Sequence, residues 1–376
     1  MKLIPVAKPE MTEADAKAAA DVIRSGWILQ GPKVEQFEKV LGGYIGGTYA
    51  VATSSCTTAM HLGLLASGIG PGDEVIVPSL SYIATANCVV HAGATPVFAD
   101  IDEQTYNIDP RDIEKRITQK TKAILAVHQI GLAADMPAIT KIANKHKLLL
   151  FEDAACGLAS RINGRHIGTY GAWSAFSFHP RKAITTAEGG LFVTGQKELA
   201  HRVQMLRAHG ASISVKARHD SKKVLIESFP LIGYNFRMSD IHAAIGISQF
   251  GRMEKLLTIR QRLAKRYNEA FKNHPMIRVP FVPAGYFHTY QSYMIRLTHG
   301  ATKRNAVMQK LLDEGIATRA GVMASHLEPP YRKMYPTLRL PVTEAVAAET
   351  IILPLFPQMS QQQQTFVIKT LLASLG

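Results

Sequence analysis

Cysteine, long apolar runs and internal repeats are all scarce in this chain of 376 residues, and each scarcity excludes a class of protein. The three cysteines (Cys56, Cys88 and Cys156) form no Cys-x-x-Cys pair and no even set, which excludes a disulfide framework and favours a reducing cytoplasm. No apolar run approaches the roughly 18 residues that a membrane helix needs. Residues 1–9 lack the apolar core of a signal peptide. We therefore expect a globular, cytoplasmic protein without a membrane partner.

Acidic residues are scarce as well, because 29 Asp and Glu stand against 43 Lys and Arg, which gives a net charge of +14. This balance suggests a nucleic-acid binder, but the basic residues are dispersed and no helix-turn-helix, zinc-finger or RNA-binding signature accompanies them. A basic surface equally attracts phosphorylated small molecules. We therefore expect a small-molecule partner, no nucleic acid and no metal.

The first half of the chain alternates short apolar runs with amphipathic stretches, which is typical of an α/β protein. The expected strands are Tyr49–Thr53, Glu74–Pro78, Thr95–Asp100, Lys122–Val127, Leu148–Glu152, Ser174–Ser177 and Gly190–Thr194. This order predicts a mostly parallel sheet with helices on both faces. In such sheets the functional site lies at the carboxyl ends of the strands.

The second half predicts a smaller α+β domain. We divide the chain into residues 1–250 and 251–376, with a proline-rich stretch at 275–283 near the start of the second part. The remaining expectations are a loop at Ala211–Glu227, a strand at Ile316–Arg319, a break at Pro329-Pro330 and a helix at Glu344–Ile351.

One lysine has neighbours that fit covalent chemistry. Lys182 lies in the turn-like segment Ser177–Gly190, between two expected strands. Burial beside the strands would lower the pKa of its amine and make it a nucleophile toward carbonyls, which is the chemistry of a Schiff base with pyridoxal phosphate (PLP). The alternative is that Lys182 is one of many solvated basic residues, and Lys182 alone does not decide between the two.

Other polar residues follow strand ends in the same way. Asp153 closes an apolar strand and needs a cationic partner if it is buried, for which the protonated pyridine nitrogen of PLP is one candidate and helix capping the alternative. Thr57 follows another strand in a run of hydroxyl residues that predicts either a phosphate site or ordinary N-capping. Tyr82 follows a third strand. The four strand-end positions together favour one site.

A set of motifs in this order resembles a known family, the DegT/StrS sugar aminotransferases. The motifs are Gly26-Trp27 with Gly31-Pro32, Ser55–Leu62, Gly70–Pro78, Glu152–Ala155, Ser177–Gly190, Gly233–Asp240 and Leu353-Pro354-Leu355. They cover essentially the whole chain. The resemblance implies the fold of type I PLP enzymes, with an aspartate aminotransferase-like large domain and a smaller C-terminal one.

The resemblance also implies the cofactor PLP and a role for each matching residue. Lys182 would hold the cofactor and move the substrate proton, and Asp153 would pair with the pyridine nitrogen. Further cofactor contacts would come from Thr57, Thr58, Tyr82, Cys156, Ser177, Asn235 and Arg237. Asn235 and Arg237 would reach the cofactor of the neighbouring subunit in a homodimer. Cys156 departs from the family pattern, since Gln or His often contacts the ring hydroxyl from this position.

The resemblance places His326 near the sugar, and Arg319 and Tyr290 are further candidates on the substrate side, with Arg319 contacting an anionic group. The alternatives are a hydrogen-bonded surface histidine for His326 and a salt-bridge partner for Arg319. The reaction implied is transfer of an amino group from glutamate or glutamine to a keto-sugar, usually a nucleotide-linked keto-deoxysugar, for a surface polysaccharide or an amino sugar. The alternatives are a keto-sugar without a nucleotide, a PLP-dependent sugar dehydratase of the same fold and a non-catalytic relative. Lys182 argues against the dehydratases that carry His in its place, and Lys182 with Asp153 argues against a non-catalytic protein.

Overall fold

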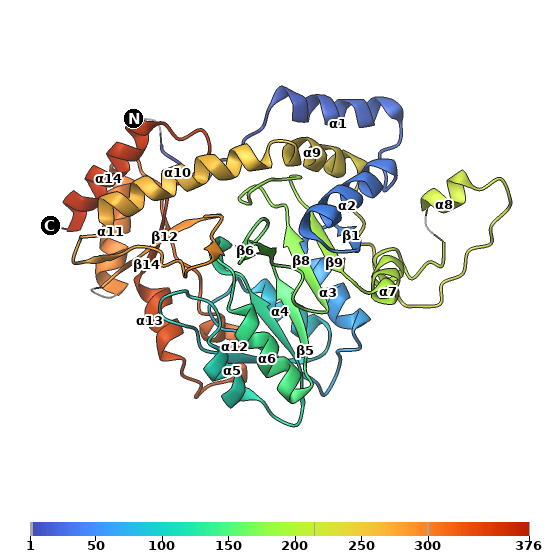
Figure 1. Ribbon diagram of the computed structural model, residues 1–376, viewed down its shortest axis with the longest axis horizontal. Helices are drawn as coiled ribbons and strands as arrows, with labels where there is room; N and C mark the ends of the chain where they lie inside the picture. The colour runs from blue at the N-terminus through green and yellow to red at the C-terminus, as the bar shows by residue number, and fades with distance from the viewer. Residues whose placement is uncertain (1–2, 214, 299–300, 376) are drawn as a thin grey trace.

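The computed structural model describes residues 3–213, 215–298 and 301–375 of the chain (Figure 1). Its centre is a sheet of seven strands in the order β1-β9-β8-β5-β4-β2-β3. The strands are β1 (Tyr49–Thr53), β2 (Glu74–Pro78), β3 (Thr95–Ala99), β4 (Thr121–Val127), β5 (Leu149–Asp153), β8 (Trp173–Ser177) and β9 (Gly190–Thr194). Only β9 runs against its neighbours, so the predicted mostly parallel sheet is confirmed.

Helices cover both faces of this sheet. The strands alternate between two apolar cores: in β4, Ile124 and Ala126 belong to one cluster, whereas Ala123 and Leu125 belong to the other. The first face carries α2 (Pro32–Ile45) and α6 (Met136–His146), and the second carries α3 (Cys56–Ala66), α4 (Ala84–His91) and α7 (Lys197–Arg207). The short α5 (Pro110–Arg116) packs beside β3. This layering buries the sheet and leaves its strand ends to carry polar side chains.

The register of the sheet brings the ends of its middle strands to one edge. Val127 pairs with Asp153, and Asp153 pairs with Ala175. The loops that follow β4, β5 and β8 therefore leave the sheet side by side. This arrangement positions the candidate site described below.

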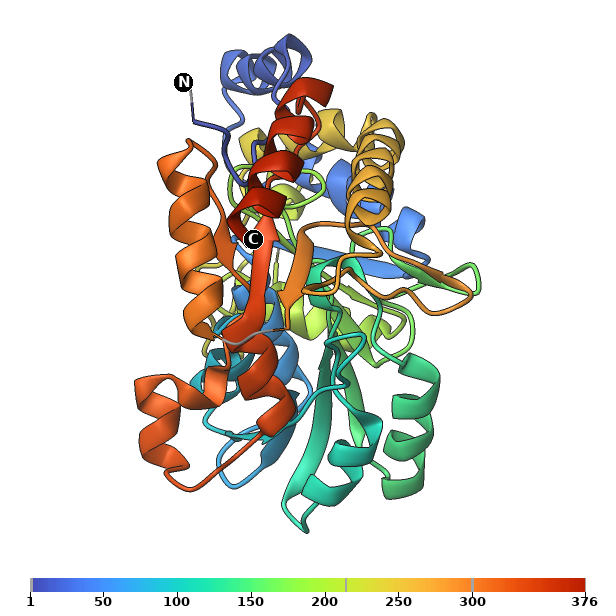
Figure 2. The ribbon, with the colours of Figure 1, turned by 90° about the vertical axis from the view of Figure 1, so that its left-hand side faces the viewer.

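The C-terminal elements form a second sheet with the order β10-β12-β14-β13. Its strands are β10 (Ile277–Arg278), β12 (Tyr293–Leu297), β13 (Arg319–Ala320) and β14 (Thr350–Leu353). The helices α10 (Met253–Phe271), α11 (Ala301–Asp313) and α14 (Gln361–Leu375) share a third core with it. Figure 2 shows these orange and red elements beside the blue and green ones of the central sheet. Ile4 pairs with Ile316, so the N-terminal arm joins this core, and the division at residue 250 stays a prediction.

Two smaller groups of elements complete the fold. A three-stranded sheet joins β6 (Arg161–Ile162), β7 (Arg165–His166) and β11 (Tyr286–Phe287). The helices α1 (Glu13–Ser25) and α9 (Asp240–Phe250) pack against each other. Within the described ranges, no helix combines the length and the apolar character that crossing a membrane requires.

Four local expectations were wrong. The expected helix at Glu344–Ile351 is α13 (Pro341–Glu349) followed directly by β14, because Ile351 and Ile352 pair with β12. The expected strand at Ile316–Arg319 begins only at Arg319. Pro329 does not break the chain but occupies the first turn of α12 (Pro329–Met334), where proline is well tolerated. The expected loop contains α8 (Val215–Asp220), which projects from the body of the molecule (Figure 1).

Candidate active site

A cavity of about 500 Å³ lies between the carboxyl ends of the central strands and the C-terminal sheet. The segments after β1, β2, β4, β5 and β8 line one side, and residues of the C-terminal part, from Gln291 to Leu355, line the other. Seven of the residues expected at the site line this cavity, namely Thr57, Tyr82, Asp153, Cys156, Ser177, Lys182 and Arg319. The sequence-based expectation that strand ends converge therefore agrees with the geometry of the cavity.

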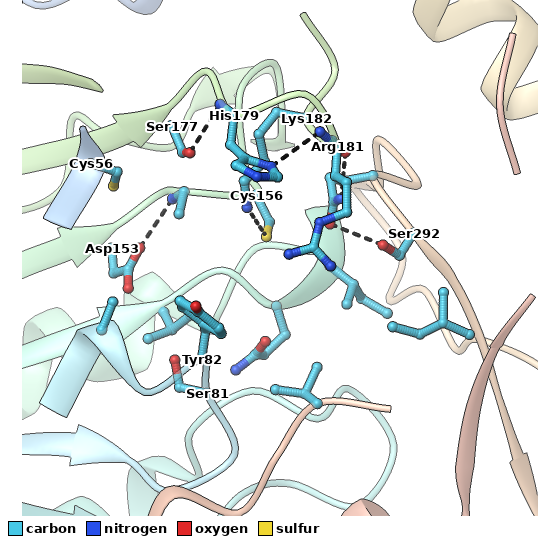
Figure 3. A pocket seen from close by; sticks show the side chains of 18 of the residues that line it. Cys56, Ser81, Tyr82, Asp153, Cys156, Ser177, His179, Arg181, Lys182 and Ser292 are labelled. Carbon is cyan, nitrogen blue, oxygen red and sulfur yellow. Dashed lines mark hydrogen bonds between the residues drawn. The ribbon is translucent and has the colours of Figure 1, made fainter. Parts of the chain in front are cut away.

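Lys182 enters the cavity from the loop between β8 and β9. Its backbone N–H donates to the carbonyl of His179 at 2.9 Å, which closes a tight turn, and its amine donates to the Cys156 sulfur at 3.1 Å (Figure 3). Burial lowers the pKa of this amine, but Cys156, Cys56 and Asp153 raise it, and the net shift of the Lys182 pKa is upward. The expectation that burial leaves the pKa of Lys182 lowered is therefore wrong in this arrangement.

Asp153 lies at the end of β5 with only 4% of its surface exposed. One carboxylate oxygen accepts from the Thr85 hydroxyl at 2.7 Å, and the other accepts from the Ala155 N–H at 3.1 Å. Burial raises the pKa of Asp153 despite these bonds. No cationic side chain of the described residues lies within ion-pair distance of it. Its donors are neutral, so a protonated ring nitrogen would supply the charge that this buried carboxylate otherwise lacks.

The preceding residue shows why only one of two adjacent carboxylates belongs to the site. Glu152 points to the opposite face of the sheet because side chains alternate along a strand. There it lies 3.1 Å from the His128 ring and accepts from the backbone N–H groups of Gly168, Tyr170 and Gly171. Glu152 therefore anchors a loop, whereas Asp153 faces the cavity.

The first turn of α3 offers donors for an anion. Ser55 caps the helix by accepting from the Thr58 N–H, and the Thr58 hydroxyl accepts from the Ser55 N–H in return. The next N–H groups, those of Cys56 and Thr57, have no hydrogen-bond partner in the described part of the chain. Together with the hydroxyls of Thr57 and Ser177, they suit a phosphate group. N-capping therefore holds for Ser55 and Thr58, and Thr58 does not line the cavity. The phosphate role of Thr57 stays a prediction.

Tyr82 and the arginines lie around the open part of the cavity. Tyr82 is 63% exposed and lies on the side of the cavity opposite His179, where its ring can face a flat ligand (Figure 3). Arg181 was not predicted, because an arginine beside Lys182 does not stand out among many basic residues. Its side chain projects toward the cavity (Figure 3). Within the described residues, the guanidinium groups of Arg181 and Arg319 have no hydrogen-bond or ion-pair partner.

Two residues expected on the substrate side do not reach the cavity. His326 is 1% exposed, with one ring nitrogen 2.5 Å from the Ser79 hydroxyl and the other 3.3 Å from Glu344. Tyr290 is 7% exposed and stacks on His288. Both side chains are taken up by contacts inside the protein. The geometry therefore gives no support to direct substrate contact by either of them.

Asn235 and Arg237 also lie outside the cavity lining. Asn235 pairs with Ala208 at the end of α7, and the carbonyl of Phe236 accepts from the Ser54 N–H at 2.8 Å. The segment thus runs beside the turn that leads into α3. Its expected role at a neighbouring subunit's site stays a prediction.

The arrangement fits PLP: an amine, a buried carboxylate without a cation and a helix terminus with free donors surround one cavity. The fold and this site define a PLP-dependent enzyme of the aminotransferase class. The chain belongs to the DegT/DnrJ/EryC1/StrS aminotransferase family, whose model matches residues 9–372. Members of this family are PLP-dependent sugar aminotransferases, and so is this protein.

The relatives extend along the whole chain. SpsC, a spore coat polysaccharide biosynthesis protein of Bacillus subtilis (strain 168), is 37% identical over 371 residues, which is 97% of this chain and 95% of SpsC. Helicobacter pylori PseC, an aminotransferase involved in the biosynthesis of pseudaminic acid, is 28% identical, with a TM-score of 0.92 over 99% of both chains. The PLP form of Spr1654 from Streptococcus pneumoniae is 29% identical, with a TM-score of 0.92 over 99% of this chain and 98% of that one.

Proposed function

We propose that this aminotransferase moves an amino group from glutamate to a nucleotide-linked keto-deoxysugar that is used for a surface polysaccharide. The observation that carries the proposal is the convergence of Lys182 and Asp153 on one cavity. The names of SpsC and PseC, which refer to a spore coat polysaccharide and to pseudaminic acid, support the sugar class. The free cysteines of the described chain fit a reducing cytoplasm as the place of this reaction.

Three residues of the cavity have direct roles toward the cofactor in this proposal. PLP supplies an aldehyde that accepts amines and a protonated ring that withdraws electrons from the reacting carbon. Asp153 holds the ring nitrogen protonated, because a buried anion stabilises a cation placed beside it. The amine of Lys182 would hold the cofactor and, when free, would move the proton at the substrate carbon. Tyr82 would cover one face of the ring.

The phosphate of PLP would lie at the start of α3. The free N–H groups of Cys56 and Thr57 point out of the first helical turn, and the hydroxyls of Thr57 and Ser177 line the same part of the cavity. A helix N-terminus stabilises an anion through its N–H groups and its dipole. Cys156 would lie near the ring, where its thiol is a weak donor in place of an amide or imidazole.

The two unpaired arginines favour anionic substrates. Arg319 and Arg181 line the cavity, and a guanidinium binds phosphate or carboxylate groups with two parallel hydrogen bonds. The phosphates of a nucleotide sugar and the carboxylates of glutamate would both meet this requirement. This is the reason to prefer a nucleotide-linked sugar to a neutral keto-sugar.

We further propose that two chains form a homodimer with shared active sites. Val224, Ile226 and Ile232, in the segment that carries α8 away from the body, are 94%, 89% and 95% exposed. Apolar side chains exposed to this extent are typical of a contact surface. Asn235 and Arg237 follow this segment and would reach the phosphate of the partner's cofactor.

The proposal is tested by two half-reactions. Glutamate should shift the visible absorbance band of the PLP-loaded protein and release 2-oxoglutarate, with glutamine compared as donor. A panel of keto-sugars, with and without a nucleotide, should then restore the band. Restoration at lower concentration by the nucleotide-linked sugars supports the proposal, whereas absence of any shift with either donor would refute it.

A further inference from the structure

We propose that Thr85 and Ser81 are positioning residues that fix the orientation and the negative charge of the Asp153 carboxylate. The inference rests on the proposed pairing of Asp153 with the ring nitrogen of PLP. Both residues line the cavity, and the role proposed for them is exerted through the Asp153 carboxylate. Thr85 acts directly on Asp153, and Ser81 acts through Thr85.

The geometry is a short chain of hydroxyl groups. The Thr85 hydroxyl lies 2.7 Å from one oxygen of Asp153, and the Ser81 hydroxyl lies 2.7 Å from the Thr85 hydroxyl. Ser81 and Thr85 are each 2% exposed, so water does not compete for these bonds. The second oxygen of Asp153 is held by the N–H of Ala155. Both carboxylate oxygens are therefore fixed from different elements, α4 and the turn after β5.

Each hydroxyl has a single proton, and this determines which group donates in each of the two hydrogen bonds. An ionised carboxylate only accepts hydrogen bonds, so Thr85 must donate its single hydroxyl proton to Asp153. The Thr85 oxygen is then free to accept, and Ser81 donates to it. A proton on the Asp153 oxygen that faces Thr85 would compete with the Thr85 hydroxyl proton for this bond. These hydroxyl groups thus favour the ionised form of Asp153, because hydrogen bonds to a charged acceptor are stronger than bonds to a neutral one.

The surroundings of Asp153 show why the hydrogen bond from Thr85 matters for its charge. Burial raises the pKa of Asp153, and the bond from Thr85 is the largest influence that lowers it, ahead of the Ala155 N–H, Lys182 and His128. Asp153 also interacts electrostatically with the buried Cys56 and Cys88 and raises the pKa of both thiols. Without Thr85, the carboxylate would keep its buried surroundings and lose its closest donor.

The hydroxyl chain is tied to the opposite side of the cavity. The Ser325 hydroxyl donates to the Ser81 carbonyl at 2.8 Å, and the Ser325 N–H donates to the Ser79 carbonyl at 2.8 Å. Leu80 and Ala324 pair as an isolated bridge. Ala324 and Ser325 therefore hold the segment that contains Ser81 in place. They directly follow Gly321–Met323, which line the cavity.

The test uses two variants that differ in one hydroxyl. Thr85→Val keeps the size of the side chain and removes the donor, whereas Thr85→Ser keeps the donor. In the holoenzyme, Thr85→Val should weaken PLP binding about 10-fold, because a hydrogen bond to a charged group is lost. The pH midpoint of the visible PLP band should rise by about one unit, because a ring nitrogen with less positive charge makes the rest of the cofactor easier to protonate. Thr85→Ser should stay close to wild type in both measurements.

The outcomes separate this inference from the proposed function. Equal effects of Thr85→Val and Thr85→Ser, or no effect of Thr85→Val, would overturn the inference. If Thr85→Val does not fold, Ser81→Ala decides, with a smaller rise of the midpoint expected and an unchanged midpoint as refutation. Asp153→Asn is the reference: if it binds PLP with the wild-type midpoint, the proposed role of Asp153 fails, and not merely its support by Thr85.

Discussion

At the scale of single residues, Cys156 shows that a contact between residues distant in sequence can change the chemistry of the site. The sequence marks Cys156 only as a departure from the family's pattern, three positions after Asp153. The structure places its sulfur 3.1 Å from the Lys182 amine, where it becomes the strongest influence that raises the pKa of that amine. The ease with which Lys182 loses its proton therefore depends on this thiol.

We predict that Cys156→Ala lowers the pKa of Lys182 in the cofactor-free protein. Removing the sulfur leaves the effect of burial less opposed, and burial favours the neutral amine. Because only the neutral amine attacks an aldehyde, the pH at which the apoprotein captures PLP rapidly should fall. Stopped-flow absorbance measures this pH profile. Cys88→Ala, which replaces a buried thiol in α4, serves as the control, and a profile that moves equally in both variants would contradict the prediction.

The residue scale also shows the limits of sequence analysis. Lys182, Asp153, Thr57 and Tyr82 could be predicted because each follows an apolar run with clear turn signals. The bond between Thr85 and Asp153 joins positions 68 residues apart, and no local pattern encodes it. Arg181 is likewise visible only after the loop is folded.

At the scale of elements, the contact between β9 and α3 shapes the expected phosphate site. Gly190 begins β9, and a Cβ atom built there would lie 2.3 Å from the carbonyl oxygen of Ser55 and 2.5 Å from the backbone nitrogen of Cys56. Only glycine permits this close approach. The first turn of α3 thus depends on a residue that belongs to a strand.

We predict that Gly190→Ala weakens PLP binding by displacing the start of α3. The backbone must shift to relieve the contact, and overpacking of this kind costs about 1–3 kcal/mol of folding free energy. Titration of the apoprotein with PLP and chemical unfolding measure the two effects. Gly195→Ala, just beyond the end of the same strand, is the matched control, because no atom lies within 4 Å of its built Cβ. Equal behaviour of the two variants would argue against this account of α3.

The elements themselves were predicted unevenly, for physical reasons. The strands of the central sheet are bounded by turns and follow one another with short connections, so their positions agree closely with the sequence pattern. β14 was missed because Ile351 and Ile352 continue the apolar pattern of α13 and become a strand only by pairing with β12. Long-range pairing overrides local propensity there.

At the scale of the whole molecule, Arg237 can distinguish an active site shared between two subunits from one built by a single subunit. Arg237 lies outside the cavity of its own chain, whereas Lys182 lies inside it. A dimer with shared sites would combine the lysine of one protomer with the arginine of its partner. This arrangement can be tested without a structure of the dimer.

We predict that inactive Lys182→Ala and Arg237→Ala chains restore activity when they are mixed and allowed to exchange. A mixed dimer has one site with both defects and one site with none, so statistical exchange should recover about a quarter of the wild-type activity. Sedimentation establishes that exchange has occurred. Mixing Lys182→Ala with Asp153→Asn is the control, since both side chains belong to one cavity, and recovery there or failure in the first mixture would contradict shared sites.

The central claim is that Lys182 is the residue that holds PLP, and one measurement tests it most directly. Borohydride reduction of the PLP-loaded protein fixes the cofactor to the amine that carries it, and peptide mass spectrometry locates the attachment. We predict a single labelled peptide that contains Lys182, and no label after Lys182→Ala. A label on another lysine, or an unchanged yield of label in Lys182→Ala, would contradict the account.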